Sequence, residues 1–108
     1  MNDITFKLSA RQLEIVCGVM DTFLQEEPQG ETLNLLYSLV ERLNIRLRKR
    51  LAERRKEYRL RLAVHDALAM RRMLLGSLEW AMRADIRDEV RLVVGVVDPV
   101  CTKYIHLV

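Results

Sequence analysis

Apolar residues recur at intervals of three and four over most of this chain, which is the spacing of one face of an α-helix. One such face contains Leu33, Leu36, Tyr37, Val40, Leu43, Leu47 and Leu51. A second face, counted from Leu60, contains Val64, Ala67, Leu68, Leu74, Leu75, Leu78, Ala81 and Met82. The stretch 31–82 has no proline and only one glycine, Gly76. The pattern therefore predicts two amphipathic helices, over residues 31–53 and 58–83.

A charged run from Glu53 to Glu57 interrupts the apolar pattern, because Arg54 and Arg55 fall on the two shoulders of the first face. We place the join there and predict a hairpin of two antiparallel helices, each about 25 residues and roughly 38 Å long. One unbroken rod of about 50 residues is the alternative, since no Gly, Pro, Asn or Ser marks a turn between Ile45 and Gly76. Such a rod would bury its apolar face only against another chain.

The first thirty residues predict an extended segment and a helix. Ile4, Phe6 and Leu8 alternate with polar residues, which fits a short edge strand or an extended arm packed on the bundle. Ser9 lies three positions before Gln12, the arrangement of a capping box, and predicts a helix over residues 9–27. Proline and glycine then follow at positions 28 and 30 and end that helix.

The C-terminal segment is ambiguous between helix and short strands. Asp85 is a suitable N-cap for a helix over residues 85–94. Valine dominates from position 90 to 97, and valine favours strands. Asp98 and Pro99 then fit either the start of a last helix over residues 99–107 or the turn of a two-stranded hairpin. We favour the helix, because a lone hairpin is only marginally stable.

Length and composition predict one mainly α domain over residues 1–108, a helical bundle built around the long antiparallel hairpin. Half of the residues are apolar and 31% are charged, which excludes a disordered polar chain. No apolar run reaches the roughly 18 residues needed to span a bilayer, and the N-terminus does not resemble a signal peptide. We therefore expect a cytoplasmic protein.

The sequence contains no motif for catalysis, cofactor binding or metal binding. His65 and Asp66 are adjacent, and neighbouring residues on a helix are expected to point to different sides rather than form a dyad. Cys101 and His106 would need two further ligands to hold zinc. We expect no enzyme activity, no metal and no cofactor.

Charge is unevenly distributed along the chain. Residues 42–61 contain ten basic and two acidic side chains, a net charge of +8, whereas the other 88 residues contain eight basic and thirteen acidic ones, a net charge of −5. The basic segment is expected to attract phosphates, an acidic membrane surface or an acidic protein. Its candidate interaction surface consists of Arg46, Lys49, Arg50, Arg54, Arg55, Lys56 and Arg59.

Two further residues suggest contacts between copies of the chain. Asn44 falls within the apolar face of the 31–53 helix, where a buried amide can set register or oligomeric state, unless it lies at the edge in water. Trp80 falls on the opposite side of the 58–83 helix from Leu74 and creates a second apolar surface, to be covered by the same chain or by another subunit.

Together these observations predict a small, non-catalytic helical module for protein–protein interaction or assembly. Its expected partners are further copies of the chain, in a homo-oligomer, or an acidic protein. The alternative is a nucleic-acid-binding accessory protein that uses the basic segment 42–61. The two differ in salt dependence, because phosphate binding weakens steeply as salt rises and apolar assembly persists.

Overall fold

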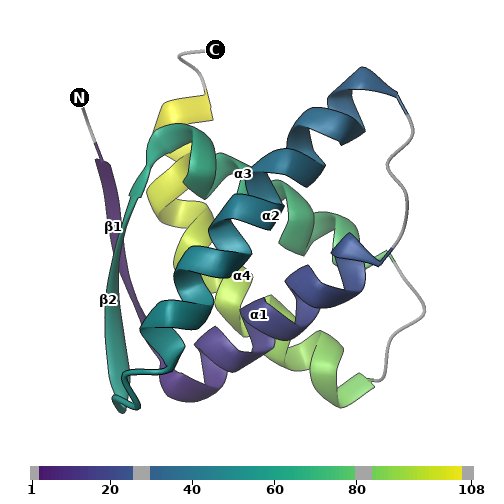
Figure 1. Ribbon diagram of the computed structural model, residues 1–108. Helices are drawn as coiled ribbons and strands as arrows, with labels where there is room; N and C mark the ends of the chain where they lie inside the picture. The colour runs from purple at the N-terminus through teal and green to yellow at the C-terminus, as the bar shows by residue number, and fades with distance from the viewer. Residues whose placement is uncertain (1–2, 26–29, 80–83, 106–108) are drawn as a thin grey trace.

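The computed structural model describes residues 3–25, 30–79 and 84–105 (Figure 1). Within them the elements follow in the order β1 (Asp3–Ser9), α1 (Ala10–Leu24), α2 (Glu31–Leu51), β2 (Glu57–Ala63), α3 (Val64–Ser77) and α4 (Ala84–Ile105). The prediction of a mainly helical protein is confirmed. The long antiparallel hairpin is not found, because a strand occupies the place where its second helix was expected to begin.

The two strands form an antiparallel ribbon in which Asp3 lies opposite Ala63 and Ser9 opposite Glu57. Successive side chains of a strand point to opposite faces, so alternating apolar residues form one apolar face. That face is buried against the helices and consists of Ile4, Phe6, Leu8, Tyr58, Leu60 and Leu62. The segment 3–9 is therefore a strand, one of the two alternatives that its alternation allowed.

The predicted start of a helix at residue 58 is wrong. Tyr58, Leu60 and Leu62 alternate with Arg59 and Arg61, and this period of two matches the buried and exposed sides of β2. The helix that follows, α3, begins only at Val64. A continuous rod is excluded for the same reason, because α2 ends at Leu51.

The predicted division of the C-terminal segment is also wrong. Helix α4 continues from Ala84 to Ile105 with Pro99 inside it. Its buried side chains, at spacings of three and four, are Val90, Val93, Val97 and Cys101. Burial of this apolar face outweighs the weak helix propensity of valine and the backbone hydrogen bond that proline cannot make. Asp98 forms an ion pair with Arg71 of α3 at 2.5 Å.

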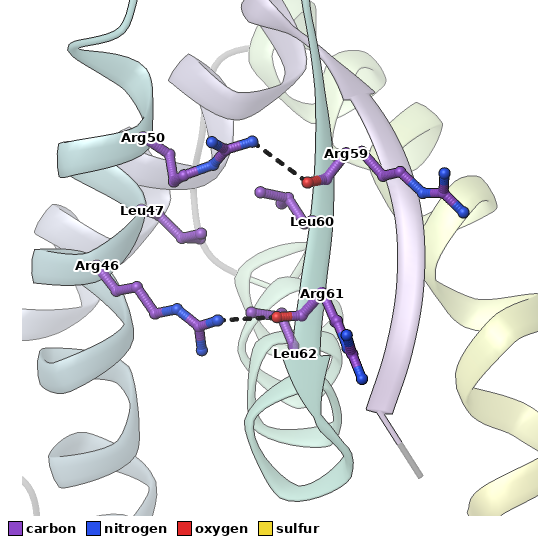
Figure 2. Close-up of a pocket in the computed structure, with 7 residues that line it drawn as sticks. All are labelled: Arg46, Leu47, Arg50, Arg59, Leu60, Arg61 and Leu62. Atoms are coloured by element: carbon purple, nitrogen blue, oxygen red, sulfur yellow. Dashed lines mark hydrogen bonds between the residues drawn. The ribbon is translucent and has the colours of Figure 1, made fainter.

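Helix α1 begins as predicted. The hydroxyl of Ser9 accepts from the backbone N–H of Gln12 at 3.1 Å, and Gln12 Oε1 accepts from the N–H of Ser9 at 2.9 Å. The four helices pack behind the buried face of the ribbon, with α2 flanking β2 and α4 flanking β1 (Figures 1 and 2). Helix α4 packs closely along β1, whereas the backbones of α2 and β2 stand further apart.

Candidate functional site

The turn between α2 and β2 is fastened by Tyr58, which is 1% exposed. Its hydroxyl donates to the carbonyl of Leu51 at 3.1 Å and accepts from the N–H of Arg55 at 2.9 Å. Arg54 adopts a positive φ of 54°, so the chain reverses within five residues. The tyrosine thereby holds the end of α2 and the start of β2 at a set position relative to each other.

The outer edge of β2 carries backbone groups that do not pair with β1. The N–H of Ala10 donates to the carbonyl of Lys56, which makes these two residues a hydrogen-bonded pair. Hydrogen-bonded pairs alternate with non-hydrogen-bonded ones along an antiparallel ladder, so the backbones of Tyr58, Leu60 and Leu62 hydrogen-bond to β1 and those of Arg59 and Arg61 do not. The N–H and C=O groups of Arg59 and Arg61 therefore point away from β1, towards α2.

Two arginines of α2 bridge the space to this edge (Figure 2). Arg46 Nη2 donates to the carbonyl of Arg61 at 2.9 Å, and Arg50 Nη2 donates to the carbonyl of Arg59 at 3.3 Å. Four helical residues advance about 6.0 Å and two strand residues about 6.6 Å, so the arginines and the carbonyls have nearly the same spacing. The guanidinium of Arg50 also lies 5.8 Å from the ring centre of Tyr58.

The space under these bridges is a groove of about 300 Å³, which we call the basic groove. It is lined by Arg46, Leu47, Arg50, Arg59, Leu60, Arg61 and Leu62. The three leucines form an apolar floor and are at most 2% exposed. The side chains of Arg59 and Arg61 lie on the solvent face of the ribbon and point away from α2 (Figure 2).

The structure separates the basic residues of segment 42–61 into two groups. Some are neutralised by carboxylates of other elements: Arg42 by Asp66 of α3, Arg48 by Asp21 of α1, and Arg61 by Asp3 of β1. Of the seven candidate surface residues, Arg50 and Arg55 share one carboxylate, that of Glu53. Within the described part of the chain, no carboxylate forms an ion pair with Arg46, Lys49, Arg54, Lys56 or Arg59.

The end of α2 is a favourable place for such a concentration of positive charge. Arg48, Lys49 and Arg50 occupy the last turn of the helix, where the partial negative charge of the helix dipole stabilises cations. This effect offsets part of the repulsion between the basic side chains. The candidate surface is therefore a positive patch in which Glu53 is paired with Arg50 and Arg55 and the other five basic residues have no ion pair among the described residues.

Asn44 finds its hydrogen-bond partner within the chain. Its Nδ2 donates to Asp21 Oδ1 of α1 at 3.1 Å, and the same carboxylate pairs with Arg48. Asn44 Oδ1 is buried and has no hydrogen-bond partner among the described residues. The amide thus joins α1 to α2, and its role in an oligomer stays a prediction. Trp80 lies outside the described residues.

His65 and Asp66 lie closer together than predicted. His65 Nε2 is 3.6 Å from Asp66 Oδ1, and Arg42 Nη2 reaches the two atoms at 3.4 and 2.9 Å. The expectation that they point to different sides is wrong, because both lie in the first turn of α3 and Arg42 draws them together. Since Arg42 already binds the carboxylate, we assign this cluster to the attachment of α2 to α3.

The remaining candidate chemistry is weak. Burial raises the pKa of Cys17 to about 11, against the opposing effect of Arg48, and burial also raises the pKa of Cys101. Both thiols are therefore protonated at neutral pH and are poor nucleophiles and metal ligands. Among the described residues there is no group of His, Cys, Asp and Glu that could hold a metal ion. None of the described helices is long and apolar enough to cross a membrane.

Comparison with protein-family models, with curated proteins and with solved structures produced no match to this chain.

Proposed function

We propose that this protein is a non-catalytic interaction module that binds an acidic segment of another protein at the basic groove. The observation that carries the proposal is the uncompensated charge of the patch. Five of its seven basic residues, including Arg46 and Arg59 of the groove, have no ion pair within the described part of the chain. The other two arginines of the groove are paired, Arg50 with Glu53 and Arg61 with Asp3. Carboxylates bind guanidinium groups through two parallel hydrogen bonds, so an acidic peptide suits Arg46 and Arg59 chemically.

The groove favours a peptide over a nucleic acid for two reasons. Its floor is apolar, which suits alternate side chains of a polypeptide. The aromatic residue of segment 42–61, Tyr58, is buried and has no exposed face on which a base could stack. Nucleic acid binding through segment 42–61 is the alternative.

Self-association of the chain stays a separate prediction that this proposal does not need. The amide of Asn44 suggested it, and that amide donates to Asp21 within the same chain. Light scattering at high micromolar concentration measures it directly.

The proposal is tested by fluorescence anisotropy with a short labelled peptide in which Glu and Val alternate. We expect this peptide to bind and its Lys–Val counterpart not to bind. The double variant Arg46→Gln/Arg50→Gln should weaken binding about tenfold, since each exposed ion pair contributes up to about 1 kcal/mol. The matched control is Arg72→Gln/Arg91→Gln, which removes the same charge from exposed positions outside the groove.

Three outcomes would contradict the proposal. One is no binding of the Glu–Val peptide at low salt, and another is an equal loss of affinity in the control variant. The third is tighter binding of a thymine oligonucleotide with a steep salt dependence, which would favour the nucleic-acid alternative. Urea denaturation checks that the groove variant is folded. We expect each substitution to change the free energy of unfolding by less than about 0.5 kcal/mol, because the exposed carbonyls return to water.

A further inference from the structure

We infer that the acidic segment binds as an added β-strand along the outer edge of β2. This inference rests on the proposed function and specifies how the partner is held. Extended peptides commonly bind an exposed sheet edge through main-chain hydrogen bonds, with alternate side chains entering adjacent pockets. The edge of β2 has the three properties that this mode of binding requires.

The first property is a set of available backbone groups. The N–H groups of Arg59 and Arg61 point away from β1 and have no hydrogen-bond partner among the described residues. Within the ranges that the structure describes, their carbonyls accept only from the side chains of Arg50 and Arg46. An incoming strand can therefore supply both donors and acceptors to this edge without disturbing the pairing of β1 with β2.

The second property is that the side chains of Arg46 and Arg50, which now cover this edge, can be displaced. Arg46 and Arg50 occupy the positions from which the N–H groups of an added strand would donate to the same carbonyls (Figure 2). When such a strand arrives, each carbonyl exchanges a side-chain donor for a backbone donor. Arg46, which has no carboxylate partner among the described residues, is released to a carboxylate of the strand, and hydrogen bonds between charged partners are stronger than those to a neutral carbonyl. Arg50 already pairs with Glu53 and gives up only its bond to the carbonyl of Arg59. The exchange thus favours an acidic strand over a neutral one.

The third property is a surface that matches alternating side chains. Residues of an added strand would face the floor of Leu47, Leu60 and Leu62 at every second position. The positions between them would lie beside Arg59 and Arg61 on the solvent face, where neighbouring side chains on adjacent strands interact. The expected partner is therefore an extended segment in which acidic residues alternate with small apolar ones. The Glu–Val peptide has this pattern.

The test uses two derivatives of the Glu–Val peptide, one with N-methyl groups on the Glu residues and one with N-methyl groups on the Val residues. Their charge and number of methyl groups are the same, and the protein is unchanged. Only every second N–H of an added strand points to β2, so one derivative should lose affinity at least tenfold and the other should bind within about threefold of the unmodified peptide. Loss on methylation at Glu means an antiparallel strand, and loss on methylation at Val means a parallel one. Equal losses would overturn the inference.

Amide hydrogen exchange is a second test of strand addition, and it observes the backbone of the protein instead of the peptide. In the free protein the N–H groups of Arg59 and Arg61 should exchange at least tenfold faster than those of Leu60 and Leu62, and the peptide should slow them. If the peptide binds and leaves their exchange unchanged, strand addition is wrong and the proposed function stands. If the peptide does not bind at all, the proposed function fails, and this inference fails with it.

Discussion

The two edges of the ribbon are covered in different ways. Helix α4 packs closely along β1 and buries Val90, Val93 and Val97. Helix α2 stands away from β2 and reaches it through the guanidinium groups of Arg46 and Arg50. Natural sheets commonly protect an edge with a helix or with charged side chains. Opening an edge closed by apolar packing would expose that apolar surface to water. An edge covered by two arginine side chains, one exposed and one partly buried, can be opened by a partner that offers them better acceptors.

The largest expected change in stability tests the edge of β1, which α4 covers. Val93→Ala should lower the free energy of unfolding by about 2 kcal/mol, because Val93 is fully buried and its loss leaves a cavity. Urea denaturation measures the change. The control is Leu92→Ala at the adjacent position, which is 65% exposed and should change stability by less than about 0.5 kcal/mol. Equal effects at the two positions would show that α4 is not held by its valine face.

A smaller expected change in stability tests the contact between α2 and α1, which lies on the side of α2 away from β2. Asp21→Ala should lower the free energy of unfolding by about 1 kcal/mol, since it leaves the partly buried amide of Asn44 without its acceptor and Arg48 without its carboxylate. The control is Asp88→Ala, which removes only an exposed ion pair with Arg91. If denaturation shows no difference in stability between Asp21→Ala and Asp88→Ala, α2 is only loosely attached to α1. The distance between α2 and β2 would then reflect that loose attachment.

The smallest expected change is an increase in stability, and it concerns Arg54 in the turn that precedes β2. Arg54→Gly should raise the free energy of unfolding by about 0.5 kcal/mol, because glycine adopts the positive φ of this turn without strain. Thermal denaturation should show a rise of roughly 3 °C in Tm. Arg55→Gly is the control, since it removes the same charge at a residue whose φ is not positive, and should be neutral or destabilising. A Tm that falls in both variants would show that Arg54 is not strained.

The sequence predicted those elements whose signals are local. The capping box of Ser9 and Gln12 located the start of α1, and the apolar face from Leu36 to Leu47 located α2. It misassigned β2, because Leu60 and Val64 also fit a helical spacing and the pairing strand lies about fifty residues earlier. Pro99 was taken as a helix start, since nothing local shows that burial of the α4 face would compensate for an internal proline.

The candidate site was predicted only in part. Counting charges identified the basic segment, including Arg46 and Arg50. It did not show which of its residues are neutralised, because Asp21, Asp66 and Asp3 come from three other elements. It also did not identify the apolar floor or the role of Tyr58. The alternation of Tyr58, Leu60 and Leu62 with arginines was the available signal, but Tyr58 and Leu62, four residues apart, also fit one face of a helix.

The pairing of β1 with β2 also sets an order of events during synthesis. Asp3 leaves the ribosome long before Ala63, its partner in the ribbon. At translation rates of about 5–20 residues per second, the wait is roughly 3–12 s. Throughout this time the apolar side of β1 has only α1 and α2 to pack against, and closing such a long loop slows folding. Strand β1 is thus made well before β2 and is among the last segments to reach its final place, and its outer partner groups stay unpaired until β2 has been made.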